Sequence, residues 1–280
     1  MDAVYQLLRG IKVLPPSPQV LPKVLDALRH ESTTLEEVGE LISLDAVLTA
    51  KLLHYCNSVY FSGREPVSNV PEAIGRVGFQ TIFALVSAVS GSRAFEAPTG
   101  SGLDSVQLWR HSLTAAFACK FVADDVEADG NLLFTAGLLH DIGRVVLSQA
   151  KGAEYGKLYT EAVAAKADVN ALEKAAYGFT HADVGAGLIE IWKLPPVLVE
   201  AVRFHHQPAA AGAGKNMAAA VCVGNGLAHQ FEHPDSGPAS ASPEVQGALN
   251  LLGLGARHLE FYDEQMQENW DFVNRLIEMH

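Results

Sequence analysis

The chain has 280 residues, of which 49% are hydrophobic, and a formal net charge of −12 at pH 7. This length suffices for one large domain or two smaller ones with a substantial apolar core. Most of the acidic excess lies after residue 100. It argues against passive binding to nucleic acid or to an anionic membrane, because both carry negative charge themselves.

The start of the chain and its cysteines predict a cytoplasmic protein without a membrane span. Residues 1–16 have an acidic second residue and no apolar run long enough for a signal peptide. No stretch approaches the roughly 18–20 apolar residues that cross a bilayer. Cys56, Cys119 and Cys222 lie far apart in apolar helical contexts. This is typical of buried thiols in a reducing compartment, not of a disulfide framework.

Apolar residues at helical spacing, with almost no strand-like alternation, predict an almost wholly helical chain. A polar loop over 57–70 and two stretches rich in Pro, Gly and Ser, 97–104 and 233–243, interrupt the pattern. In chain order, helices are predicted over 2–10, within 14–28 after a Pro-rich entry, and over 34–43, 45–56, 71–77, 79–96, 105–124, 131–149, 153–167, 170–177, 180–192, 196–206 and 215–231, with a helical tail to 280.

These elements predict an all-α fold, a multi-helix bundle with an N-terminal helical subdomain. We expect the N-terminal part over 1–100, the helical core over 105–232, and a linker with a C-terminal helical tail over 233–280. The tail either packs on the bundle or mediates dimerisation, and packing is the more common outcome.

The pair His140-Asp141 stands inside the apolar segment 133–147. A carboxylate among apolar residues is costly unless it is paired, hydrogen-bonded or bound to a metal. Three arrangements satisfy it: metal ligation by both side chains, a polar cluster with another buried histidine, or the capping of a helix break near Gly143. The dipeptide alone does not choose between them.

Histidines in four separate predicted helices stand within or beside apolar sequence: His111, His140, His181 and the pair His205-His206, whereas His229 and His233 have more polar surroundings. Imidazole is the commonest metal ligand at neutral pH, and facing helices can build two-metal centres from carboxylates and histidines. Taken singly, each histidine is more often a hydrogen-bonded core or helix-end residue. Taken together, they support a metal site about as well as a polar network.

His205 and His206 need a special local structure to share one site. Adjacent residues on a helix point about 100° apart, so the two rings converge only near a frayed helix end. Pro208, two residues further on, indicates such an end.

The order His, His-Asp, His, His-His resembles the HD superfamily of metal-dependent phosphohydrolases. Within it, the chain is most similar to the HDOD domain, a bacterial signalling module. The resemblance implies kinship with the HD-GYP cyclic-di-GMP phosphodiesterases, although HDOD domains have mostly lost catalysis. The resemblance covers roughly residues 10–232 and implies an all-α fold. It is carried by the segments 14–28, 35–61 and 67–86 and by the motifs LWRHS, GLLHDIGR, THADVGAGLIEIWKLP and HHQP.

The resemblance also implies roles for single residues. The positions that match metal ligands are His111, His140, Asp141, His181, His205 and His206, which implies one or two ions of iron, manganese or zinc. Arg144 stands where the HD-GYP pattern has a phosphate-contacting lysine. Asn225 replaces its last ligand aspartate, Gln207 replaces a glutamate, and PAAAGAG replaces the Gly-Tyr-Pro signature. An amide is a weaker, neutral ligand.

We therefore expect a non-catalytic regulatory module that contacts a protein partner. The candidate surface is the N-terminal block with the loop 57–70, framed by Tyr55, Tyr60 and Phe61, although such aromatics beside leucines are more often core residues.

The alternative is an active metal-dependent phosphohydrolase acting on a nucleotide or cyclic dinucleotide. Asp141 and Arg144 would then serve catalysis, and the amide at 225 counts against it. A nucleic-acid-binding regulator has little support, because the acidic chain lacks a basic stripe.

Overall fold

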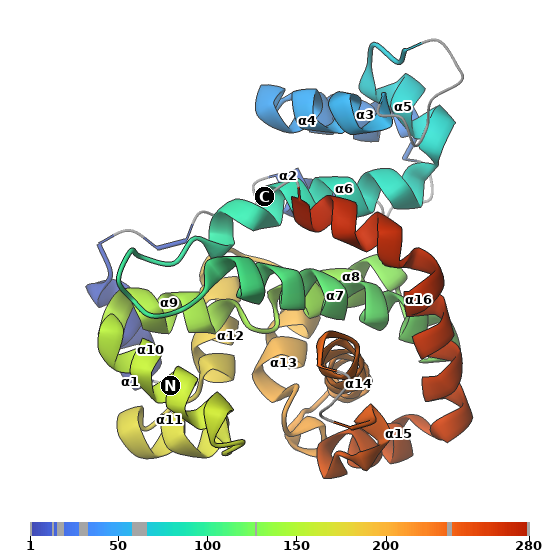
Figure 1. Cartoon of the computed structure of the whole chain (residues 1–280). Helices are drawn as coiled ribbons and strands as arrows, with labels where there is room; N and C mark the ends of the chain where they lie inside the picture. The colour runs from blue at the N-terminus through green and yellow to red at the C-terminus, as the bar shows by residue number, and fades with distance from the viewer. Residues whose placement is uncertain are drawn as a thin grey trace. The chain divides into compact units, whose positions relative to one another are not determined.

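The computed structural model describes residues 2–12, 14–15, 20–27, 33–57, 66–126, 128–233 and 237–278 (Figure 1). Every regular element in these ranges is a helix, which confirms the predicted all-α fold. None of these helices is both long enough and apolar enough to cross a bilayer. The helices form two units, a smaller one within residues 17–93 and a larger one from residues 1–16 and 94–278.

The smaller unit is a cluster of short helices with one strongly apolar member. That member is α6 (Phe79–Ser92), which is buried over most of its length and contacts α2, α4 and α5. The others are α2 (Val20–Ala27), α3 (Leu35–Ser43), α4 (Ala46–Cys56) and α5 (Val70–Val77). α3 begins with a capping box in which Thr34 accepts from the Glu37 amide while Glu37 accepts from the Thr34 amide.

The larger unit is built around α7 (Ser105–Ala123), which packs against α8, α14 and α16. α12 packs against α9 and α13, and α1 lies on α12. The remaining helices of this unit are α1 (Asp2–Gly10), α8 (Gly130–Leu139), α9 (Ile142–Lys151), α10 (Ala153–Ala164), α11 (Val169–Tyr177), α12 (His181–Ile191), α13 (Pro196–Phe204), α14 (Lys215–Glu232), α15 (Pro243–Leu252) and α16 (Ala256–Glu278). The predicted boundaries at 100 and 233 stay predictions, although α1 lies with the larger unit.

The single helix predicted over 131–149 is wrong, because the structure breaks it at the His140-Asp141 pair. α8 ends at Leu139 and α9 begins at Ile142, with Asp141 at φ −101° and ψ 6° between them. The Asp141 side chain makes no capping hydrogen bond to α9. The oxygens of Asp141 are therefore left for other side chains, among them Arg144 in the first turn of α9.

The C-terminal tail packs on the bundle. The Phe272 ring of α16 meets Phe117 of α7 edge-on at 5.5 Å between centroids, and Trp270 lies 4.5 Å from Phe231 of α14. Aromatic pairs at these distances stabilise a helix interface beyond the area that they bury. Dimerisation through the tail stays a prediction.

The predicted partner surface is described only in part. Tyr55 is 5% exposed, so it belongs to the core of the smaller unit, and its expected place on the surface is wrong. Tyr60 and Phe61, with most of the loop 57–70, lie outside the described residues.

Candidate metal centre

The larger unit brings the predicted histidines together around Asp141. His181 Nε2 lies 3.1 Å from Asp141 Oδ1, His140 Nε2 lies 3.6 Å from Oδ2, and His205 Nε2 lies 4.0 Å from Oδ1. These side chains are almost fully buried. They come from the α8–α9 break, from the first residue of α12 and from the end of α13, so three separate chain segments meet at one carboxylate.

His140 and His205 are held in the same way. The Nδ1–H of His140 donates to the Gly137 carbonyl at 2.7 Å, and that of His205 donates to the Val202 carbonyl at 2.7 Å. Each bond reaches three residues back, to the last turn of a helix. With the proton fixed on Nδ1, the lone pair of Nε2 is turned toward Asp141.

The buried atoms at this place without a hydrogen-bond partner among the described residues include three that can bind a metal: His140 Nε2, His205 Nε2 and Asp141 Oδ1. Unsatisfied polar atoms are costly in a core, so their convergence calls for an explanation. A divalent metal ion, which accepts lone pairs from imidazole and carboxylate, explains all three. The residues present therefore fit a metal: His181, His205 and His206 form one group of possible ligands, and His111, His140 and Asp141 form a second.

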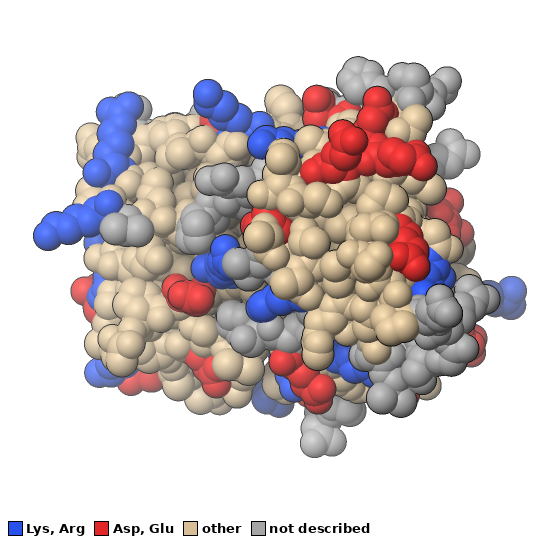
Figure 2. Space-filling model, turned by 90° about the horizontal axis from the view of Figure 1, so that it is seen from above, with Lys and Arg blue, Asp and Glu red and all other residues tan. Residues whose placement is uncertain are grey.

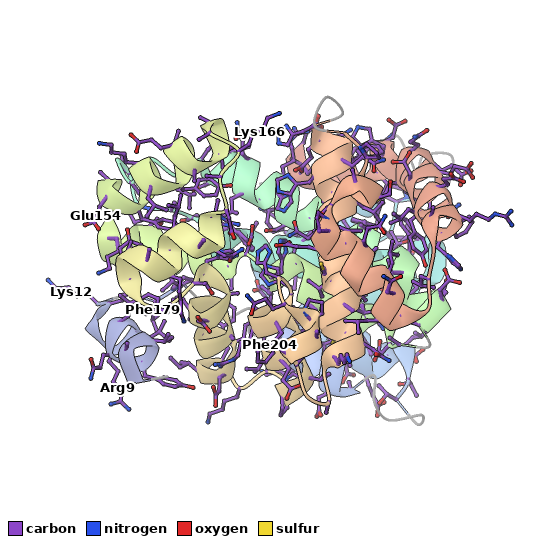
Figure 3. The ribbon with its side chains drawn as sticks, turned by 90° about the horizontal axis from the view of Figure 1, so that it is seen from below. Arg9, Lys12, Glu154, Lys166, Phe179 and Phe204 are labelled. Carbon is purple, nitrogen blue, oxygen red and sulfur yellow. The ribbon has the colours of Figure 1, made fainter. Side chains whose placement is uncertain are left out.

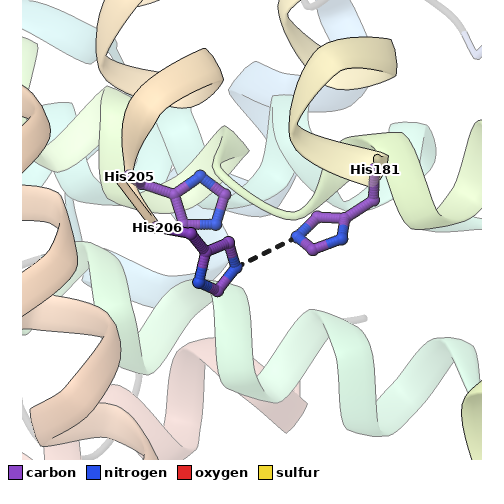
Figure 4. Close-up of side chains that lie close together, drawn as sticks. All are labelled: His181, His205 and His206. Carbon is purple, nitrogen blue, oxygen red and sulfur yellow. Dashed lines mark hydrogen bonds between the residues drawn. The ribbon is translucent and has the colours of Figure 1, made fainter. Parts of the chain in front are cut away.

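His181, His205 and His206 form one face of the centre (Figure 4). His206 Nε2 lies 3.3 Å from His181 Nε2, and the His206 and His205 rings are 4.1 Å apart. α13 ends at Phe204, which allows two consecutive histidines to face the same place. Burial, with the nearby His181, lowers the pKa of His206 to about 3 and keeps its ring neutral, the form in which imidazole binds metals.

Asp141 stays ionised although it is buried. Burial alone would raise its pKa, but Arg144, His140 and His181 outweigh this and hold the pKa well below its usual range. Arg144 Nε lies 2.7 Å from Asp141 Oδ2, and its guanidinium lies over the Tyr159 ring, 4.8 Å from the centroid. Asp141 thus offers one oxygen to Arg144 and the other to the histidines.

His111 lies beside the centre but is already bonded at both ring nitrogens. Nδ1 is 2.9 Å from Glu232 Oε2, and Nε2 is 3.0 Å from Asn225 Oδ1. The carboxylate of Glu232 only accepts, so Nδ1 donates, and Nε2 is hydrogen-bonded to the amide of Asn225. Burial lowers the pKa of His111, but the bond to Glu232 outweighs it and raises the pKa overall.

The centre can be reached from outside through a cavity of about 270 Å³ whose lining includes His111, Asp141, Arg144 and His229. A second cavity, of about 410 Å³, shares Arg144 and His229 with the first and also meets Asn225. Arg144 therefore lies where both cavities approach the candidate ligands.

Sequence reasoning missed two carboxylates at this site. Glu173 of α11 is fully buried and bonded to His181, and His181 with other charges lowers its pKa to about 2 against the effect of burial. Glu232 holds His111 across 121 residues of sequence. In the sequence both look like ordinary helix-surface glutamates, and no local pattern marks them.

The sequence matches the family model of the HDOD domain over residues 14–208. A curated protein of Treponema pallidum, described as uncharacterized, is 27% identical over 202 residues, which cover 69% of this chain and 37% of that protein. The chain thus spans little more than a third of the length of this relative.

Two solved structures share the fold over nearly the whole chain. An HDOD domain protein of unknown function from Geobacter sulfurreducens has a TM-score of 0.77 at 20% identity and covers 99% of this chain and 96% of its own. A candidate phosphohydrolase from Shewanella amazonensis has a TM-score of 0.73 at 27% identity and covers 97% of both chains. The first shows the fold alone.

Proposed function

Since the chain belongs to the HDOD domain family, we propose that it is a regulatory module that binds a protein partner, holds one metal ion at Asp141 and does not turn over a substrate. The observation that carries this proposal is the pair of hydrogen bonds made by His111. Both of its ring nitrogens are occupied, by Glu232 and by Asn225.

A two-metal hydrolase needs ligands for both ions, because one ion activates water and both clamp the scissile phosphate. His181, His205 and His206 lie close enough together to hold one ion, and His111, His140 and Asp141 form a second such group. On the His111 side the neutral amide of Asn225 stands at hydrogen-bonding distance instead of a bridging carboxylate. This supports weaker binding in the group that contains His111, and so a site that holds one ion.

The charges and the exposed apolar side chains on the surface favour a protein as the partner over a nucleic acid. On the face shown in Figure 2, Lys and Arg side chains are interspersed with Asp and Glu and do not join into a basic stripe. In the smaller unit, Leu35 is 49% and Leu44 is 74% exposed, at the two ends of α3. We propose that the partner contacts this helix. Leu44→Glu should then weaken partner capture at least tenfold without changing the far-UV circular dichroism of the module.

One observation favours the alternative, a metal-dependent phosphohydrolase. The cavity of about 270 Å³ leads to both Asp141 and Arg144, so a phosphate could meet a cation beside the candidate ligands. The Shewanella amazonensis protein described as a candidate phosphohydrolase is also similar to this chain over 97% of its length.

The deciding experiment measures metal content and hydrolysis on the same preparations. Protein purified without chelator or nickel resin should contain one equivalent of iron, manganese or zinc by mass spectrometry, and Asp141→Ala should lose it. Bis(p-nitrophenyl) phosphate should not be hydrolysed above the rate of the Asp141→Ala control. Hydrolysis that depends on Asp141 would overturn the non-catalytic proposal, and Asn225→Asp would then be expected to increase it.

A further inference from the structure

Glu173 lies outside the set of candidate ligands but is bonded directly to one of them. It belongs to α11, its side chain is fully buried, and its carboxylate accepts three hydrogen bonds. Oε2 accepts from the backbone N–H of His181 at 2.7 Å and from its Nδ1–H at 2.8 Å. Oε1 accepts from the Tyr155 hydroxyl at 2.8 Å.

These bonds determine which nitrogen of His181 faces the centre. The carboxylate has only acceptors for its three donors, so Nδ1 must carry a proton. Because Oε2 binds the amide and the ring of the same residue, it fixes both the backbone position and the rotation of the imidazole. Nε2 then lies 3.1 Å from Asp141 Oδ1 and 3.3 Å from His206 Nε2.

Glu173 is itself held from a second helix. Tyr155 of α10 is fully buried, and α10 packs against α11. In Figure 3, Glu154 and Lys166 mark α10 and its end, and Phe179 marks the turn that leads from α11 into α12. A buried carboxylate is costly unless it is hydrogen-bonded, and Glu173 uses its acceptors to hold His181 in one orientation.

We propose that Glu173 is a positioning residue that keeps the proton of His181 on Nδ1 and presents Nε2 to Asp141 and to a bound metal. The metal part of this inference rests on the proposed function. Carboxylates bonded to metal-ligating histidines commonly change metal affinity 10–100-fold when they are replaced.

The first test compares the affinity for Co²⁺ by calorimetry in the whole protein. Glu173→Gln keeps the shape but removes the charge and should weaken binding about tenfold, and Glu173→Met also removes the acceptors and should approach a hundredfold. Tyr155→Phe is the matched control: it loses one bond to Glu173, leaves the bond to His181, and should change the affinity less than about threefold. The visible absorption of bound Co²⁺ should shift in the Glu173 variants and not in Tyr155→Phe. Equal effects in all three variants would overturn the proposal.

The second test needs no change at Glu173, so it holds even if these variants fail to fold. Nitrogen-15 NMR of the histidine rings in the metal-free protein, with His181 assigned by its loss in His181→Gln, should show a protonated Nδ1. An unprotonated Nδ1 would overturn the proposal. Wild-type protein that binds no Co²⁺ but shows the protonated Nδ1 would remove the metal from the proposed function and leave the positioning role of Glu173 in place.

Discussion

Gly143 of α9 lies directly against the first turn of α12, so that a Cβ atom at this position would fall 1.9 Å from the carbonyl oxygen of His181. The same atom would lie 2.7 Å from the backbone nitrogen of Gly185. Only glycine allows this approach, and the approach places His181 next to Asp141, two residues before Gly143. The glycine thus belongs to the site through its missing side chain.

Gly143→Ala should therefore destabilise the protein by about 3 kcal/mol, the upper end of the range for overpacked core substitutions. It should also weaken metal binding, because α12 must move away from α9 and carries His181 with it. Urea denaturation and calorimetric titration with Co²⁺ measure the two effects.

Gly247→Ala is the matched control for this change. Gly247 lies within α15 with nothing near its missing side chain, so alanine should stabilise the helix by about 0.5–1 kcal/mol and leave the affinity unchanged. A Gly143→Ala protein as stable as wild type would show that the two helices are not in close contact.

The capping box of α12 offers a second way to disturb the centre, because the helix begins at His181 itself. Thr180 Oγ1 accepts from the Asp183 amide, and Asp183 Oδ2 accepts from the Thr180 amide. Thr180→Ala should cost about 1 kcal/mol of unfolding free energy and reduce metal affinity. Thr34→Ala removes the same motif from α3 and should cost as much without changing metal affinity. If both variants change metal affinity alike, the effect is not local to α12.

The helical fold could be predicted because its signals are local. Apolar spacing and caps lie within a few residues of one another, and the predicted helix over 105–124 differs from α7 by one residue at its end. The predicted helix over 131–149 ran through the break because the apolar spacing continues across it, although a helix break near Gly143 was one of the three arrangements open to His140-Asp141. At the break, His140 Nδ1 is bonded to the Gly137 carbonyl and Asp141 is buried, and neither feature is visible in apolar spacing.

The site was predictable where residue type alone carries the chemistry, as with His140 and Asp141. It was not predictable for Glu173 and Glu232, whose roles arise from contacts across the bundle. His111 is likewise far in the sequence from Glu232 and Asn225, so the sequence could not show that both of its ring nitrogens are hydrogen-bonded.

Tyr262 should anchor the C-terminal helix through a single hydrogen bond. Its side chain is fully buried, and its hydroxyl donates to Asp125 Oδ2 at 2.5 Å. Tyr262→Phe should lower the unfolding free energy by about 1 kcal/mol, the typical contribution of one hydrogen bond, because Asp125 is exposed and water can replace the hydroxyl. Tyr5→Phe removes an exposed bond to Glu190 and should cost less than about 0.5 kcal/mol. Equal losses in thermal or urea denaturation would contradict a buried anchor.

The cysteines should make the protein sensitive to high pH. Burial raises the pKa of Cys56 to about 11 and that of Cys222 to about 12, and it raises the pKa of Cys119 as well. A raised pKa means that the folded state disfavours the thiolate. The stability is therefore fully present below the pKa of an unfolded thiol, about 8.5, and is lost as the pH rises from there toward 11 and 12.

At pH 8 the folded protein should accordingly react with Ellman's reagent at least tenfold more slowly than the protein in 6 M guanidinium, in which all three thiols should react. The reaction of the folded protein should accelerate above pH 9 together with a fall in unfolding free energy, because the same thiolates drive both. Each Cys→Ser variant assigns the share of one thiol. A thiol that reacts rapidly at pH 8 in the folded protein would show that its helix opens far more often than its burial implies.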